Sequence, residues 1–288
     1  MTNVPKVGIV VLNYNGRDCL LPCLRSLDAL EYSNKEIIIV DNGSTDDSLP
    51  KAELLFPHFT FIRNEKNEGF AKGMNRGMER AFLRGAEWAL LFNYDAEIDS
   101  QALSELIGVA EKNPRAGLLS PVIYTKGDNV LWFAKGKIDF FRMRAVHEKV
   151  SEKEFSLEAY PSEFLTGCSL LIKKELTDTI GFLDEQFFLY YEDADYSLRA
   201  KQAGFDCLVV PKARVWHSEE STKNPKKMYF LVSSGLLFFQ KHTPVLFRPY
   251  MWLYGTIRRL KNLLDRMFEV SASREEVYRA YKDFYHEH

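Results

Sequence analysis

The chain has 288 residues, of which 46% are hydrophobic and 27% are charged, and its formal net charge at pH 7 is −2. This length suits one large α/β domain or one domain with an appendage, and the near-neutral charge gives no reason to expect a nucleic-acid partner. No segment reaches the ~18 uninterrupted apolar residues that a membrane span needs, and no signal-peptide pattern is present. The four scattered cysteines are typical of reduced thiols in a cytoplasmic protein, although Cys19 and Cys23 could share a helix face as a zinc pair.

The first half of the chain alternates strand-like and helix-like segments. The predicted strands occupy 7–12, 36–40, 59–63 and 88–92, and the predicted helices occupy 19–30, 74–84 and 100–113. A glycine-bearing loop is expected at 67–73. This alternation predicts a mostly parallel sheet with helices on both faces.

The second half is less regular. We expect strands at 118–124, 164–173 and 205–210, helices at 174–180 and 196–202, and a hairpin or loop region over 127–161. From Met228 the pattern is helical to the end of the chain. This helical tail is basic and rich in aromatic residues, which is typical of a helix at a membrane surface. Packing against the rest of the chain, or against a second copy in a homodimer, is the alternative.

An aromatic run at 187–191 leads directly into three carboxylates, Glu192, Asp193 and Asp195. Crowding carboxylates beside aromatic side chains raises the pKa of at least one of them, and a buried carboxylate without a partner is unfavourable. The cluster therefore needs a cation partner or supplies a catalytic base. The alternative is an acidic first turn of the helix expected over 196–202, which the helix dipole would favour.

Polar side chains follow three of the predicted strands, at Asn13 and Asn15, at Asp41, and at Asn93 and Asp95. In an open α/β sheet, ligands bind beyond the carboxyl ends of the strands, so one crevice is expected to collect these residues. Ordinary turn chemistry could also place each of them there. Without a G-x-G-x-x-G motif after the first strand, a bound phosphate needs another counter-charge. Asn93 and Asp95 face the same side of an extended chain and offer oxygen ligands to a divalent cation.

Two further features are weaker signals. The two glycines of the loop at 67–73 would let the backbone approach a ligand, but a simple strand-to-helix connection has the same composition. His217 follows the last predicted strand and could be a third metal ligand, whereas a lone histidine is more often structural.

Taken in order, these segments resemble the family 2 glycosyltransferases with a GT-A fold, and within them the bacterial rhamnosyltransferase-like subgroup. The matching motifs are VVLNYNG at 10–16, VDNGSTDDS at 40–48, NEGFAKGMNRGM at 67–78, LLFNYDAEI at 90–98, FLTGCSLLIKKE at 164–175, GFLDEQFFLYYEDADYSLRAKQAGF at 181–205 and ARVWHSEEST at 213–222. The resemblance covers most of residues 5–240. Each motif alone is modest, but the ordered series is specific.

The resemblance implies an α/β GT-A fold with a mostly parallel central sheet, helices on both faces and a C-terminal helical segment. It divides the chain into a nucleotide-sugar-binding and catalytic domain at 1–225 and a helical extension at 226–288. The implied reaction is the inverting transfer of a sugar, rhamnose in this subgroup, from a nucleoside diphosphate sugar. The implied acceptor is a hydroxyl of a saccharide or lipid-linked molecule in bacterial cell-surface polysaccharide synthesis. The implied cofactor is Mg²⁺ or Mn²⁺, and the implied location is the cytoplasm, at the inner face of the plasma membrane for a lipid-linked acceptor.

The resemblance also implies roles for individual residues. Asp193 matches the catalytic base, and Glu192, Asp195 and Arg199 look like supporting positions. Asp95 and His217 match residues that bind the metal and the diphosphate. The nucleotide-sugar-binding positions are Asn13, Asn15, Asp41, Asn67, Gly69, Gly73, Asn75 and Asn93, where Asn93 replaces the first aspartate of the family's DXD motif.

Two other functions remain as alternatives. A nucleotide-sugar-binding protein without catalysis is conceivable because Asn93 departs from the DXD pattern, although the intact Glu192-Asp193-x-Asp195 series argues against it. A nucleotidyltransferase would share the sheet architecture, but it would need a glycine-rich, basic phosphate loop after the first strand, where only Arg17 is basic.

Overall fold

The computed structural model describes residues 4–156, 158–218, 225–268 and 271–287. Its centre is one large sheet with the strand order β10-β12-β6-β11-β4-β1-β2-β3, to which β5 and β7 add at β12 and β6. The strands are β1 (Val7–Asn13), β2 (Lys35–Asp41), β3 (Thr60–Arg63), β4 (Trp88–Asn93), β5 (Ala96–Ile98), β6 (Ala116–Thr125), β7 (Leu131–Phe133), β10 (Tyr160–Pro161), β11 (Ser169–Lys173) and β12 (Asp206–His217).

The order of strand directions confirms a mostly parallel sheet. β1 pairs in parallel with β2 and β4, β2 with β3, and β6 with β12, whereas β11 runs antiparallel to both β4 and β6. All seven residues of β1 are buried, which explains its unbroken apolar sequence, because both faces of such a strand are covered. The predicted α/β fold is therefore confirmed.

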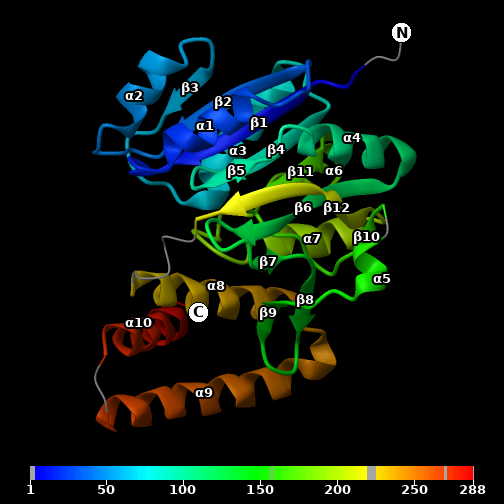
Figure 1. The fold of residues 1–288 in the computed structure, drawn as a ribbon. Coiled ribbons are helices and arrows are strands. Elements are labelled where there is room, and N and C mark those ends of the chain that lie inside the picture. The colour runs from blue at the N-terminus through cyan, green and yellow to red at the C-terminus, as the bar shows by residue number, and fades with distance from the viewer. Residues whose placement is uncertain (1–3, 157, 219–224, 269–270, 288) are drawn as a thin grey trace.

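Helices connect and cover these strands, as Figure 1 shows. They are α1 (Leu20–Asp28), α2 (Ser48–Leu55), α3 (Phe70–Leu83), α4 (Ala102–Lys112), α5 (Glu152–Phe155), α6 (Lys174–Ile180) and α7 (Glu192–Gln202). α3 packs on β1 and β2, and α4 packs on β6 and β12.

The loop expected at 67–73 is shorter than predicted, because α3 already begins at Phe70. Gly73 therefore lies inside the helix, where a Cβ would come within 2.4 Å of Leu12 Cδ1. At Gly77 a Cβ would come within 2.1 Å of Val10 Cγ1. Gly73 and Gly77 therefore let the helix approach β1 closely, whereas Gly69, just before the helix, has a φ of +86° that favours glycine.

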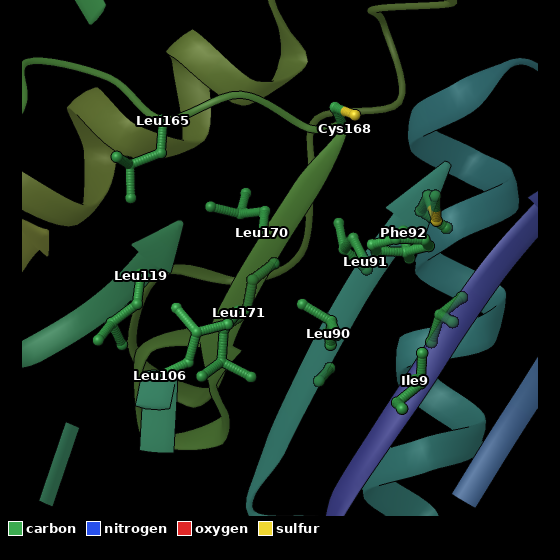
Figure 2. Close-up of a cluster of buried hydrophobic side chains, with 14 of the residues drawn as sticks. Ile9, Leu90, Leu91, Phe92, Leu106, Leu119, Leu165, Cys168, Leu170 and Leu171 are labelled. Carbon is green, nitrogen blue, oxygen red and sulfur yellow. The ribbon is translucent and has the colours of Figure 1, made fainter. Parts of the chain in front are cut away.

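The core beneath the sheet's polar edge is apolar and closely packed. Figure 2 shows side chains of Ile9, Leu90, Leu91, Phe92, Leu170 and Leu171 from three neighbouring strands, with Leu106 and Leu119 beside them. All of them are fully buried. Because such cores resist deformation, the strand ends above this one are held in fixed positions.

Three other element boundaries differ from the predictions. α7 begins at Glu192 rather than at residue 196, so the three carboxylates lie in its first turn. β11 begins at Ser169, so the segment before it is a loop rather than strand. β12 continues past residue 210 to His217, so this histidine ends a strand instead of following one.

The region expected as a hairpin or loop contains the two-stranded hairpin of β8 (Gly136–Asp139) and β9 (Arg144–His147). The predicted helical tail consists of α8 (Lys226–His242), the short η2 (Val245–Phe247), α9 (Arg248–Phe268) and α10 (Ala272–Glu287). In Figure 1 these helices lie below the sheet, and the hairpin points toward α9. Within the described residues, no helix combines the length and apolar character that crossing a membrane requires. The domain division after residue 225 stays a prediction.

Candidate active site

A cavity of about 410 Å³ lies at the carboxyl ends of the central strands. Loops after β1, β2 and β4, the loop before β11, the first turn of α7, the hairpin and the start of α8 all contribute to its wall. Seven residues singled out from the sequence line it, namely Asn67, Gly69, Asn93, Asp95, Glu192, Asp193 and His217. The fold therefore places Asp95, the Glu192–Asp193 pair and His217 around one cavity.

Asp95 and His217 meet although 122 positions separate them in the chain. β5 follows Asp95 directly and pairs with the end of β12, where His217 lies opposite Ala96. The His217 Nε2 atom lies 3.1 Å from Asp95 Oδ1. Both side chains are nearly buried, and His217 Nδ1 has no hydrogen-bond partner. A buried nitrogen and oxygen at this separation form a pair that one small cation could bridge.

The turn before α7 is strained. Tyr190 and Tyr191 have φ values of +70° and +67°, a left-handed conformation that residues other than glycine rarely adopt. Strain of this kind persists only where the surroundings enforce it, and it is concentrated at functional sites. Here Tyr191 packs on the α8 residues Phe238 and Phe239, and its neighbour Phe188 stacks on Phe230. The α8 contacts therefore hold the turn that presents the three carboxylates.

Asp193 is half-buried and faces the cavity. Its Oδ2 accepts a hydrogen bond of 2.9 Å from the Gly167 amide, and its Oδ1 accepts one of 2.7 Å from the Ala194 amide. Burial raises the pKa of Asp193, while these two hydrogen bonds and the charge of His147 lower it. The net effect is a carboxylate with a raised pKa, held in one orientation, which suits a general base.

Glu192 also lines the cavity, but its environment is different. The residue is only 4% exposed, and its Oε2 atom is buried without a hydrogen-bond partner. Burial, and then the charge of Asp193, raise the pKa of Glu192 well above its ordinary value. Burial therefore favours the neutral form of Glu192, a carboxylic acid that can donate a hydrogen bond.

Asp195 does not line the cavity. Its carboxylate lies 2.7 Å from a side-chain nitrogen of each of three residues, Arg199 of α7 and Lys241 and His242 of α8. Burial raises the pKa of Asp195, but the hydrogen bonds from His242 and Lys241 and the charge of Arg199 outweigh it and bring the pKa to about 2. Asp195 therefore links α7 to α8 through a carboxylate that is ionised at neutral pH.

The polar residues at the ends of β1 and β2 hold the loops beside the cavity rather than lining it. The Asn13 amide, fully buried, donates to Asp41 Oδ1 at 2.8 Å, and Asp41 Oδ2 accepts from the Ser44 amide at 3.0 Å. Asn15 Oδ1 accepts from the Thr45 amide at 2.8 Å. Their residue types are those that the sequence predicted for a nucleotide pocket, and that role stays a prediction.

Three other predicted site residues also lie outside the cavity wall. Asn75 exchanges two hydrogen bonds with the Leu183 backbone, at 2.9 and 3.1 Å. Arg199 donates to the carbonyls of Ile180 and Phe182, and Gly73 lies against β1. These contacts connect α3 and α7 to the segment that leads into the acidic turn.

Several wall residues were not predicted from the sequence. Asn42, next to Asp41, donates hydrogen bonds of 3.0 Å to Asn67 Oδ1 and to the Gly69 carbonyl, which fixes the edge of the loop at 67–69. His147 of the hairpin and Lys227 of α8 line the opposite side. The only usable sequence signal was for Asn42, which lies in the VDNGS motif, because the hairpin and α8 reach the site only through the fold.

The comparisons with known proteins agree with this geometry. The family model for Glycosyl transferase family 2 matches residues 8–181. An N-acetylglucosaminyl-diphospho-decaprenol L-rhamnosyltransferase of Mycobacterium tuberculosis is 28% identical over 92% of this chain and 94% of its own length. The dTDP-rhamnosyl transferase RfbF of Shigella flexneri is 24% identical over 82% of this chain and 81% of its own length.

Two solved structures of similar fold contain a nucleotide or nucleotide sugar together with Mn²⁺. A mannosyltransferase from Pyrobaculum calidifontis, in complex with GDP-Man and Mn²⁺, matches with a TM-score of 0.62 at 15% identity, over 98% of this chain and 74% of that one. GalNAc-T7 with UDP, GalNAc and Mn²⁺ matches with a TM-score of 0.65 at 20% identity, over 82% of this chain but about half, 51%, of that one. The family match covers more than half of the chain, so the chain belongs to glycosyl transferase family 2, as its motifs predicted, and is a nucleotide-sugar glycosyltransferase.

Proposed function

We propose that the protein is an inverting, metal-dependent glycosyltransferase that adds rhamnose to a lipid-linked or saccharide acceptor during bacterial cell-surface polysaccharide synthesis. The observation that carries this proposal is that one cavity contains a fixed carboxylate with a raised pKa, Asp193, together with Asp95 and His217, whose Oδ1 and Nε2 atoms lie 3.1 Å apart. The sugar and the acceptor class rest on similarity to the two rhamnosyltransferases. A non-catalytic binding protein would have no need for the oriented carboxylate, and family 2 membership disfavours a nucleotidyltransferase.

Asp95 and His217 would hold a Mg²⁺ or Mn²⁺ ion against the donor's diphosphate. His217 Nε2 and Asp95 Oδ1 lie 3.1 Å apart and offer a nitrogen and an oxygen, the kinds of atom that bind such cations. No group of three His, Cys, Asp or Glu side chains converges in the described part of the chain, so phosphate oxygens and water would complete the shell. Such a cation would neutralise the leaving diphosphate.

Asp193 would accept the proton of the acceptor hydroxyl. As that oxygen forms a bond to the anomeric carbon, the bond from this carbon to the diphosphate oxygen breaks, and the diphosphate leaves with the electron pair. Displacement on the opposite face inverts the anomeric centre and needs a single base. The Gly167 and Ala194 amides keep the Asp193 oxygens in place while the proton arrives.

Glu192, as a neutral acid beside Asp193, would donate its hydrogen bond to a sugar hydroxyl. A buried donor at the cavity wall favours a hydroxyl over an apolar group beside it, because the alternative leaves a buried polar group unpaired. The Asn42 and Asn67 side chains and the Gly69 backbone would border the nucleotide, with Asn13 and Asp41 behind them.

A donor panel tests the proposal. Thermal unfolding is measured with dTDP-, UDP- and GDP-sugars in the presence of Mn²⁺, followed by transfer to a polyprenyl-diphosphate-linked sugar. We expect selective stabilisation by dTDP-rhamnose, since a ligand at 100 times its Kd adds about 2.7 kcal/mol. Stabilisation by no nucleotide sugar would contradict the proposal, and donor binding without transfer would favour the non-catalytic alternative.

Metal removal provides a second test. EDTA should abolish transfer and Mn²⁺ or Mg²⁺ should restore it, because a divalent cation stabilises the leaving diphosphate. Asp95→Asn should raise the Mn²⁺ concentration needed for half-maximal rate, whereas Asp178→Asn, at an exposed surface carboxylate, should leave it unchanged. Full transfer in EDTA would refute the role given to Asp95 and His217.

A further inference from the structure

Helix α9 turns its apolar face away from the protein. Leu253, Ile257, Leu260 and Leu264 recur at intervals of four, three and four residues, so they lie along one side of the helix. They are 55%, 54%, 54% and 55% exposed. A surface helix normally buries such a stripe against the core, and a contiguous exposed apolar face marks an interaction site.

The other side of α9 packs against the protein. The leucine stripe is therefore exposed on a helix that is held in place, and not because the helix is detached. Gly255 is buried, and a Cβ there would come within 3.1 Å of the Tyr285 hydroxyl of α10. Arg259 lies over the Tyr285 ring, 5.2 Å from its centroid. α10 packs in turn on α8, and Arg279 of α10 lies 4.5 Å from the centre of the Tyr229 ring of α8. Figure 1 shows α9 as the outermost of the three helices.

The apolar surface continues onto η2 and the hairpin. Leu246 is 92% exposed, and Phe247 packs edge-on against Phe141 at the hairpin tip. The Tyr250 hydroxyl donates a hydrogen bond of 2.7 Å to the Phe141 carbonyl. Since the same hairpin carries His147 into the cavity wall, this surface is connected to the active site through one short ribbon.

Charge identifies the partner. Residues 245–265 contain four cationic side chains and one acidic side chain, Asp265, in a chain with a net charge of −2. Of the cations, Arg248, Arg258 and Lys261 are exposed, whereas Arg259 packs on Tyr285. Trp252, an aromatic residue typical of membrane interfaces, is 66% exposed beside the leucines. Cations flanking an apolar stripe fit an anionic phospholipid surface, whereas the core of an interface between protein copies is depleted in charge.

We propose that α9, η2 and the hairpin tip form a docking surface for an anionic phospholipid bilayer, with α9 lying in the plane of the interface. The leucine stripe and Trp252 enter the boundary between headgroups and acyl chains, and Arg258 and Lys261 contact lipid phosphates. The cavity is then presented at the membrane through the hairpin. Binding to lipid needs neither donor nor acceptor, so this inference is tested separately from the proposed transfer reaction.

The test is co-sedimentation of the full chain with vesicles of phosphatidylglycerol and phosphatidylcholine. Wild type should bind, and the double variant Leu253→Glu, Leu260→Glu should bind at least 10-fold more weakly, because both side chains would leave the apolar layer. The matched control is Leu83→Glu, at a leucine that is 78% exposed on α3, and it should bind as wild type does. Lys261→Gln should weaken binding about 5-fold, and more salt should weaken it further.

Two results would overturn the inference. One is that the wild-type protein does not bind vesicles, or that the double leucine variant and Lys261→Gln both bind as well as wild type does. The other is a lipid-free dimer, measured by sedimentation velocity, that dissociates in the double variant, since this would assign the face to a second copy of the chain. Because Lys261→Gln removes only an exposed charge, it remains informative if the double variant fails to fold.

Discussion

Three carboxylates of a single helical turn lie in three different environments, and the difference follows from a few contacts. The Glu192 Oε2 atom is buried without a hydrogen-bond partner, Asp193 accepts two backbone hydrogen bonds, and Asp195 contacts side-chain nitrogens of Arg199, Lys241 and His242. The pKa of Glu192 is therefore raised strongly, that of Asp193 is raised, and that of Asp195 is lowered to about 2. Such separation of neighbouring acids is how one site obtains different proton-transfer roles.

Glu192→Gln should leave the protein at least as stable as wild type at pH 8, while lowering the rate of transfer. The raised pKa means that keeping Glu192 in the fold becomes less favourable as pH rises above the ordinary glutamate value, and glutamine has no such dependence. Thermal unfolding at pH 5 and pH 8 provides the check. A variant clearly less stable at pH 8 would mean that the carboxylate is ionised and paired.

As pH is lowered, kcat/KM should begin to fall at a pH above the ordinary aspartate pKa of about 4. The reason is that the base must be deprotonated and the pKa of Asp193 is raised. His147 lowers that pKa through its charge, so His147→Gln should move the acid limb to higher pH. An acid limb that stays in place in His147→Gln would argue against Asp193 as the titrating group.

At the scale of elements, α8 holds the turn that carries the three carboxylates. Asp195 of α7 contacts Lys241 and His242 of α8, and the Ser234 hydroxyl donates to the Leu189 carbonyl at 2.8 Å. Helix α8 also contributes Lys227 to the cavity wall. The C-terminal helices therefore take part in forming the site, whatever their role at a membrane.

Asp195→Asn should destabilise the protein by about 3 kcal/mol, because it removes a fully buried carboxylate and leaves Arg199 and Lys241 without their counter-charge. The pKa of about 2 in the folded protein lies below the ordinary aspartate value of 3.8, so the stabilisation by Asp195 is complete above pH ~4 and is lost as pH falls through ~2. Urea unfolding should therefore show a smaller difference in stability between wild type and Asp195→Asn at pH 3 than at pH 7. Equal stability of variant and wild type at pH 7 would exclude this link between α7 and α8.

The contact between α3 and β1 gives a second prediction for an element. Gly77→Ala should destabilise the protein by about 2 kcal/mol, since the new Cβ would meet Val10 Cγ1 at 2.1 Å and overpack the core. Gly108→Ala in α4 is the matched control, because a Cβ there meets nothing within 4 Å and alanine favours helix. Chemical denaturation of the two variants side by side checks the difference in sign.

How far the sequence predicts these elements depends on whether the signal is local. The buried strands at 7–12 and 88–92 were predicted within a residue because an unbroken apolar run is itself the signature of a covered parallel strand. The start of α3 was missed because Gly73 suggested a loop, whereas its cause is packing on Leu12, which only the fold reveals. The start of α7 was missed because the left-handed Tyr190 and Tyr191 carry no composition signal.

The same limit applies to the site at the scale of the whole molecule. Its strand-end residues Asn93, Asp95 and His217 were predictable because parallel strands end at one edge, and the ordered motifs carried the family. His147 and Lys227 could not be predicted, because the hairpin and α8 reach the cavity only after the chain has folded. The sheet is thus typical of the family, and the second half of the chain supplies the opposite wall of the cavity.

The most direct test of the account is the kinetics of Asp193→Asn, measured together with donor binding. We predict that transfer falls by at least about 100-fold, because the acceptor hydroxyl loses its base, while the affinity for the nucleotide sugar stays within about 2-fold. The same measurement on Asp206→Asn, at a carboxylate that pairs with Arg115 away from the cavity, should match wild type. Normal transfer by Asp193→Asn would contradict the assignment of this cavity as the catalytic site.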